Sequence, residues 1–159
     1  MVLVLVYVDD ILLTSDSYAL IHFVIQALTF RFALKTLVSI SYFLRFEAFR
    51  DSSDLYLNQS KYISDSLVKK NMVHAKPSST PMALGQKVAL EDNAPFPDVT
   101  TLYHSTICAL QYLTLTRPDI SLSVNKLSQF LKDPTQHYWS ACKCLLRYVS
   151  GTPTLGLSF

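Results

Sequence analysis

Residues 2–13 read VLVLVYVDDILL, and this stretch decides the fold of the N-terminal part of the chain. Apolar runs rich in Val, Leu and Ile stand on both sides of Asp9 and Asp10, which is typical of two short strands joined in a hairpin. Because side chains alternate along a strand, Tyr7 and Asp9 are predicted to share one face while Val8 and Asp10 share the other. A tight turn between Asp9 and Asp10, or just before them, would bring both carboxylates to the tip.

The residues of the acidic pair, taken alone, leave two interpretations open. An Asp-containing turn needs no function, because Asp tolerates turn geometry and hydrogen-bonds its own backbone. Two carboxylates held together also suit Mg²⁺, which takes one or two of them and completes its shell with water and substrate phosphates.

The composition bounds the size and class of the protein. Its 159 residues are 50% hydrophobic and 16% charged, with a mean hydropathy of +0.24. This length allows one ordinary domain or two small subdomains, and the apolar composition indicates surface that meets another part of a larger protein. The net charge of +2 neither indicates nor excludes a nucleic-acid partner, because local clusters of charge matter more than the total.

Neither a membrane span nor a secretory signal is expected. The first apolar run covers only residues 1–8, whereas a span needs about 20 residues, and it has no basic leader and no small-residue cleavage site. Cys108, Cys142 and Cys144 have no CxxC spacing, so we expect free thiols and neither zinc nor a disulfide.

The rest of the chain predicts an α+β fold. A helix over residues 19–32 follows a Ser-Asp-Ser start at 15–17, and its wide apolar stripe predicts burial on more than one side. A second hairpin is predicted from strands 42–49 and 55–58, joined by the polar turn 51–54. A helix capped by Ser60 should run to about Lys70, with its inward face formed by Ile63, Leu67 and Val68.

Beyond this helix, periodicity fades over residues 72–99, which hold four of the seven prolines and are predicted to form a linker. A helix is then expected from Thr100 or Thr101 to about Arg117, where Pro118 starts a new one that runs to about Lys132. A last helix is predicted from 133–134 to 150–151, which gives three helices in the second half.

Several motifs follow each other in a fixed order. YVDDILLT at residues 7–14 precedes YFLRFE at 42–47, LNQSKYI at 57–63 and STPM at 79–82. ALQYLTLTRPDI at 109–120 and LRYVSGT at 146–152 come next. In this order they resemble the Ty/copia class of retrotransposon reverse transcriptase, part of a Pol polyprotein, and the resemblance runs nearly end to end.

The resemblance implies a domain plan. Residues 1–71 would be the C-terminal half of the polymerase palm, built from two β-hairpins with packed helices, and 72–99 the linker. Residues 100–152 would be a three-helix thumb-like segment, and 153–159 the start of the connection towards RNase H. The implied activity is RNA-directed DNA polymerisation, a two-metal nucleotidyl transfer on an RNA or DNA template.

The resemblance also implies roles for the first hairpin. Asp9 would touch both Mg²⁺ ions and Asp10 would be a secondary ligand, while Tyr7 and Val8 would lie beside the primer terminus and the nucleotide. The family's third aspartate and its fingers are expected upstream of Met1, so the chain alone is expected to be an inactive, truncated polymerase.

The motif at 42–47 would hold the primer's 3′ end through Phe43, Leu44, Arg45 and Phe46. Arg45 stands where the family has a glycine, and TLVS at 36–39 replaces a stretch that normally reads Asp-Leu-Gly-Pro. Glycine permits a positive φ that Arg and Val resist. Either Arg45 contacts a phosphate, or the change reflects relaxed selection, as does the total of three glycines.

His104, Cys108 and Tyr112 recur at four-residue spacing and therefore share a helix face. The resemblance places this face along the minor groove of the template–primer duplex; the alternative is a face packed on neighbouring helices. Cys108 and His104 stand where the family has glycine and often arginine, which would weaken attraction to phosphates.

The partners implied are template–primer nucleic acid, either an RNA/DNA or a DNA duplex, and the fingers–palm half and RNase H of the parent polyprotein. The implied location is cytoplasmic, in the virus-like particle of the parent element, or nuclear, without secretion. Two alternatives remain: a fragment that binds nucleic acid or an intact polymerase without catalysis, and a translated remnant that does not fold.

Overall fold

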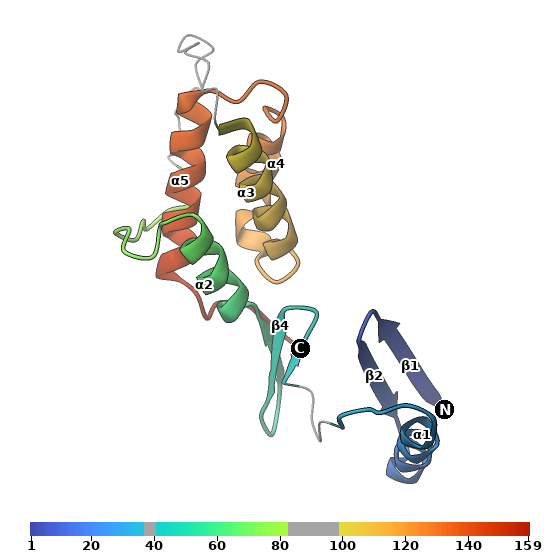
Figure 1. Cartoon of the computed structure of the whole chain (residues 1–159). Helices are drawn as coiled ribbons and strands as arrows, with labels where there is room; N and C mark the ends of the chain where they lie inside the picture. Colours follow the sequence, from blue (N-terminus) through green and yellow to red (C-terminus); the bar gives the residue numbers. More distant parts are fainter. Residues whose placement is uncertain (37–40, 83–98) are drawn as a thin grey trace. The chain divides into compact units, whose positions relative to one another are not determined.

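The computed structural model describes residues 1–36, 41–82 and 99–159 and has the mixed α and β composition that the sequence predicts (Figure 1). Within these residues there are five α-helices and two antiparallel sheets. Contacts divide the chain into two compact units, Met1–Leu44 and Arg45–Phe159, and each is described by itself.

The first unit is a hairpin with one helix. Strand β1 (Val2–Tyr7) pairs with β2 (Asp10–Ser15) in the register that sets Val2 opposite Ser15 and Tyr7 opposite Asp10. Helix α1 (Tyr18–Arg31) starts where predicted, but Ser17 at its N-cap makes no side-chain capping bond. Instead the Ser15 hydroxyl oxygen accepts a hydrogen bond from the Ser17 amide at 3.2 Å.

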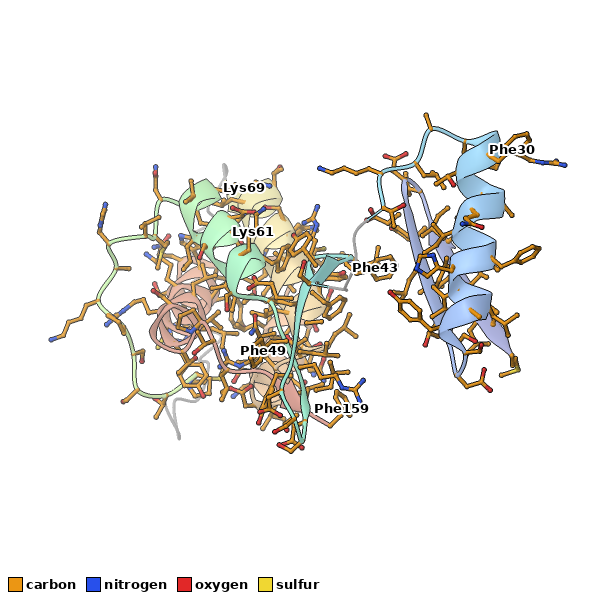
Figure 2. The ribbon with its side chains drawn as sticks, turned by 90° about the horizontal axis from the view of Figure 1, so that it is seen from below. Phe30, Phe43, Phe49, Lys61, Lys69 and Phe159 are labelled. Carbon is orange, nitrogen blue, oxygen red and sulfur yellow. The ribbon has the colours of Figure 1, made fainter. Side chains whose placement is uncertain are left out.

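The prediction that this helix is buried on more than one side is wrong. No residue of α1 is buried within the unit, and Phe23 and Phe30 are 68% and 92% exposed. Figure 2 shows Phe30 projecting from the end of the helix. The reason is geometric: α1 packs on β2, and a single neighbour covers one stripe of a helix that is apolar on several sides.

The second sheet has the strand order β3-β4-β5-β6. The single strand predicted over 42–49 is divided into β3 (Tyr42–Phe43) and β4 (Phe46–Arg50). The division arises because Leu44 and Arg45 form a turn with φ of 49° and 65°. The predicted turn 51–54 leads into β5 (Leu55–Asn58). It is held by an Asp51 carboxylate oxygen, which accepts the amides of Ser53 and Asp54, both at 2.8 Å.

The C-terminal tail returns to this sheet as β6 (Leu157–Ser158), which the sequence did not predict. Leu157 pairs with Leu57 and Ser158 with Tyr56, antiparallel. The approach requires a glycine just before the strand, since a Cβ on Gly156 would lie 2.1 Å from the carbonyl oxygen of Leu57.

The remaining helices build the core of the second unit. They are α2 (Ser60–Lys69), α3 (Val99–Leu113), α4 (Ser121–Ser128) and α5 (Gln136–Gly151), with a 3₁₀ turn at Pro118–Ile120. The three-helix second half is confirmed: α3, α4 and α5 pack on one another (Figure 1). Helix α3 ends earlier than predicted, at Leu113, and Pro118 starts the 3₁₀ turn as expected.

The core lies where α2 meets the three helices. Residues that are fully buried include Tyr103, Ile107, Val124 and Leu145. Helix α2 begins one residue after its cap, Gln59, rather than being capped by Ser60. Ile63 and Leu67 point inward as predicted, but Val68 is 62% exposed and Tyr62 takes the place expected for it.

Residues 72–82, the first part of the predicted linker, lie against α5. Met72 is buried, the Ser78 amide donates to the Arg147 carbonyl at 3.3 Å, and Arg147 Nε donates to the carbonyl of Lys76. Residues 83–98 of that linker lie outside the described residues, as do 37–40. In the described parts of the chain, no helix combines the length and the apolar character that a membrane crossing needs.

Candidate nucleotidyl-transfer and duplex-binding site

The first hairpin closes with a two-residue turn formed by Val8 and Asp9. Tyr7 and Asp10 are opposite partners across this turn, so their side chains share a face. The prediction that Tyr7 shares a face with Asp9 is therefore wrong, because alternation stops where the strand ends at Tyr7. The turn was predicted between Asp9 and Asp10 or just before them, and the observed turn consists of Val8 and Asp9.

The tip is open to solvent and its backbone is unusual. Asp9 and Asp10 are exposed, as are Tyr7 and Val8. Val8 has φ 49°, a left-handed conformation that a β-branched residue adopts only at a cost. A strained turn thus presents two adjacent carboxylates.

The two carboxylates at this tip are oxygen donors of the kind that Mg²⁺ prefers. Two exposed carboxylates match the ion's preference for one or two protein carboxylates plus water and phosphate oxygens. Within residues 1–36, 41–82 and 99–159, no three His, Cys, Asp or Glu side chains gather closely enough to hold a metal ion. The metal-binding role of Asp9 and Asp10 stays a prediction.

The motif 43–46 is the tight turn between β3 and β4, with Leu44 and Arg45 as its two central residues, both at positive φ. Two central residues at positive φ are the signature of a type I′ turn, which prefers Asn and Gly. Such a backbone favours glycine, which is the residue that the resemblance implies at this position in the family. Phe43, Leu44 and Phe46 are half-buried, while Arg45 is exposed.

Tyr62 of α2 connects this turn to α3. The Arg45 guanidinium lies 5.2 Å from the centroid of the Tyr62 ring, which packs edge-on against Tyr112 at 5.3 Å. Tyr112 also contacts Phe46, with ring centroids 5.8 Å apart. Burial raises the pKa of the Tyr62 phenol, and the nearby Arg45 charge opposes this. Two predicted sites, the primer-holding turn and the α3 face, therefore converge on a residue that the sequence did not single out.

The face of α3 formed by His104, Cys108 and Tyr112 is divided in its surroundings. A ring nitrogen of His104 hydrogen-bonds the carbonyl of Leu131, in the segment after α4. Cys108 is exposed, and Tyr112 is half-buried in the aromatic cluster. Packing on neighbouring elements is thus observed at the two ends of the face, while the duplex contact stays a prediction.

Three further basic side chains lie on α2 and its C-terminus, namely Lys61, Lys69 and Lys70. Figure 2 labels the first two on this helix. Lys70 Nζ donates to the Ser105 hydroxyl of α3, and burial lowers the pKa of its ammonium group. Lys61 and Lys69 lie on α2 with the acidic Asp65 between them, and Arg45 contacts Tyr62 of the same helix.

A cluster of polar contacts in the second unit surrounds Arg117, which is 0% exposed. Its Nε and Nη2 donate to the two carboxylate oxygens of Asp119 at 2.9 and 2.8 Å. Nη1 donates to the Thr152 carbonyl at 2.7 Å and Nη2 to the Thr152 hydroxyl at 2.8 Å. The Tyr148 hydroxyl donates to Asp119 at 2.9 Å. These four residues are called the Arg117 node.

The Arg117 node favours the ionised form of the Asp119 carboxyl. The hydrogen bonds from Arg117 hold the pKa of the Asp119 carboxyl below its usual range. In the sequence, Arg117 and Asp119 were named only as members of a motif. The signal that could have identified them is an Arg and an Asp two residues apart at a helix break. Such a spacing lets a guanidinium fork meet a carboxylate.

The cysteines are free thiols as predicted: Cys108 is exposed, Cys142 buried and Cys144 half-buried. Burial raises the pKa of the Cys142 thiol to about 12.

Comparison with known proteins adds the family. The family model of reverse transcriptase (RNA-dependent DNA polymerase) matches residues 1–84. No solved structure matches the chain.

Relatives match almost the whole chain. A retrovirus-related Pol polyprotein from transposon RE2 of Arabidopsis thaliana is 44% identical over 96% of this chain and 10% of its own length. The corresponding protein from transposon RE1 is 45% identical over 98% of this chain and 11% of its own. An uncharacterized mitochondrial protein of Arabidopsis thaliana is 42% identical over 96% of this chain and 63% of its own.

The chain spans about a tenth of the length of the two Pol polyproteins. The match runs through both units, so the resemblance stated on the motifs is confirmed from end to end. The chain belongs to the reverse transcriptase (RNA-dependent DNA polymerase) family, in the Ty/copia type of retrotransposon Pol polyproteins.

Proposed function

We propose that residues 1–71 are the second half of a reverse transcriptase palm and residues 100–152 a thumb-like segment, in a parent protein that performs RNA-directed DNA synthesis. The observation that carries this proposal is the hairpin tip, where the strained turn of Val8 and Asp9 leaves Asp9 and its neighbour in sequence, Asp10, exposed. The partners would be the fingers–palm half, RNase H and a template–primer duplex, in the cytoplasmic particle of the parent element.

The chemistry assigned to the tip is simple. Mg²⁺ held there supplies Lewis-acid stabilisation for the oxygens that attack and leave at a nucleotide's α-phosphate. Asp9 and Asp10 would bind the cations and neutralise their charge, and Tyr7, which is paired across the strands with Asp10, is proposed to contact the primer terminus. Because the described residues offer no third metal ligand, we propose that the chain alone does not polymerise.

A chimera tests the assignment of the tip. In an active Ty/copia-type polymerase, residues 1–159 replace the matching stretch, and DNA synthesis on an RNA template is measured. Asp9→Asn should lower the rate by at least about a hundredfold, since a carboxylate that holds the metal is lost. The matched control is Asp133→Asn, at an exposed position between α4 and α5, which should leave synthesis unchanged. Synthesis that survives Asp9→Asn would sink the assignment.

The second candidate is binding without catalysis, and the basic side chains of the second unit favour it. Arg45, Lys61, Lys69 and Lys70 lie on one turn and one neighbouring helix, where they can neutralise successive phosphates. The ordinary alternative for Lys69 is a helix cation that stabilises the C-terminal end of α2.

Salt dependence separates these two roles. The full chain is titrated with a labelled RNA/DNA hybrid at about 50 and about 200 mM salt, and nucleotide incorporation is followed in parallel. Lys61→Gln and Lys69→Gln should each reduce the slope of log affinity against log salt by about one. Lys126→Gln on α4 is the control. Binding that is insensitive to salt, or a slope that stays the same in both variants, would refute duplex binding by this surface.

A further inference from the structure

The Arg117 node lies where the sheet of the second unit joins its helices. Strand β5 ends at Asn58, and the next residue, Gln59, is fully buried and accepts the Thr116 hydroxyl at 2.8 Å. On the other side, α5 ends just before Thr152, which receives two bonds from Arg117. Two adjacent residues, Thr116 and Arg117, thus hold the start of α2 and the end of α5.

A direct bond closes the ring of segments. The Ser60 hydroxyl donates to the carbonyl of Pro153 at 2.9 Å, across 93 residues of sequence. Four residues later the chain enters β6, which pairs with β5. Strand β5 therefore leads into the segment that Thr116 bonds, and β6 follows the segment that Arg117 bonds.

The charge of Arg117 makes this junction sensitive to its partners. A buried guanidinium is costly unless its donors are paired, and here Nε, Nη1 and Nη2 all have partners. The planar fork serves Asp119 and Thr152 at once, which a lysine ammonium does not reproduce. The contacts hold only when the end of α5 lies at one position relative to the start of α4.

The sheet carries the turn with Arg45. Strand β4, which follows that turn, pairs with β5 from Glu47–Asn58 to Arg50–Leu55, and Arg45 and Phe46 rest on Tyr62 and Tyr112. A displacement of β5 at its junction with α2 would therefore move Arg45 relative to the open face of α3.

We propose that Arg117 is a positioning residue: by fixing the ends of β5 and β6 on the helices, it sets the place of the Arg45 turn beside α3. The inference rests on the proposed duplex binding for its functional consequence, because Arg45 is then one of the groups that contact phosphate. The positioning itself is a property of the fold and is tested separately.

Hydrogen exchange tests the positioning. The amides of Leu55 and Phe159 bond each other's carbonyl oxygens at 2.9 and 3.0 Å and report on the sheet, while Ile107 and Leu145 report on the helices. In Arg117→Lys, exchange at the two sheet amides should rise at least about tenfold while the helix amides change by less than about twofold. Arg147→Lys is the control, because this helix arginine donates to the Lys76 carbonyl, away from the sheet.

Asp119→Asn covers the case in which Arg117→Lys fails to fold, since the amide keeps one acceptor for Arg117. The same pattern, exchange raised in the sheet and not in the helices, supports the proposal. Equal loss of protection in sheet and helices, or none in either, overturns it.

A double-mutant cycle tests the consequence. Arg45→Ala and Arg117→Lys should each weaken binding of the RNA/DNA hybrid, and the double variant should lose less than the product of the two, because one acts through the other. Multiplicative losses would show independent action and overturn the link to Arg45. A wild-type chain that binds no duplex would refute the proposed function instead, and hydrogen exchange would then decide the positioning alone.

Discussion

Arg45 combines a strained backbone with a favourable contact, and the two can be separated by substitution. Its φ of 65° costs an L-residue roughly 1–2 kcal/mol, whereas its cation–π contact with Tyr62 contributes roughly 0.5–1 kcal/mol. Arg45→Gly should therefore raise the free energy of unfolding by up to about 1 kcal/mol, measured by urea denaturation.

Arg45→Ala gives the opposite sign from the same site. Alanine keeps the strain and loses the contact with Tyr62, so a loss of about 0.5–1 kcal/mol is expected. If both variants shifted the urea midpoint in the same direction, the balance of strain and contact assigned to this turn would be wrong.

Asp119 makes stability depend on pH in the acid range. Its bonds from Arg117 lower its folded pKa below the ordinary value of 3.8, so the ionised form favours the folded state. This contribution is fully present above pH 3.8 and is lost as the pH falls through the lower folded pKa. The melting temperature of the wild type should therefore fall more steeply on acidification than that of Asp119→Asn between about pH 4 and pH 2. Parallel curves for the two proteins would contradict the pairing.

At the scale of single elements, the return of the tail depends on Gly156. A methyl group at this position would lie 2.1 Å from the Leu57 carbonyl oxygen, so Gly156→Ala must displace β6 from β5. We expect a loss of about 1–3 kcal/mol in the free energy of unfolding, with faster hydrogen exchange at Leu55. Ser158→Ala on β6 is the control, since Ser158 is exposed and the change adds no atom between the strands.

Local pattern predicts those elements whose signal lies in neighbouring residues. The alternation and apolar runs around Asp9 and Asp10 gave the first hairpin, and Pro118 marked the break after α3. Strand β6 was not predicted, because two residues carry no periodicity and the strand that they pair with, β5, lies about 100 residues away in sequence. The break at Leu44 and Arg45 was also not predicted, since neither residue type indicates a positive φ.

The candidate site follows the same division. Its exposed carboxylates and its motif order can be read along the chain, and they led to the family. Tyr62 and Arg117 act through contacts between distant segments, such as the bonds from Arg117 to Thr152. A sequence without an alignment gives no reason to prefer these residues to any other tyrosine or arginine.

At the scale of the whole molecule, burial differs sharply between the two units. Every residue of the described core belongs to Arg45–Phe159, and none of the described residues of Met1–Leu44 is classed as buried. Burial of apolar surface supplies most of the stability of a fold, so the second unit should unfold cooperatively and the first should open at little cost.

Limited proteolysis can check this difference. Digestion under native conditions should cut within residues 1–44 first and leave a fragment of 45–159 that keeps the fluorescence of Trp139, the single tryptophan. The melting temperature followed at Trp139 should stay within a few degrees of that of the intact chain. Loss of the Trp139 transition on removal of the first unit would show that the two units fold together.

The backbone pairing of Phe159 with Leu55 also sets the direction in which a longer polypeptide would leave. Strand β6 runs antiparallel to β5, so a residue joined after Phe159 would emerge next to Asp54, at the turn held by Asp51. A fluorescent protein fused there, or the next module of a polyprotein, would thus begin alongside the β4–β5 turn. Dyes on Ser53 and on such a fusion would be close enough for efficient energy transfer. The transfer efficiency would then report whether the tail stays paired with β5.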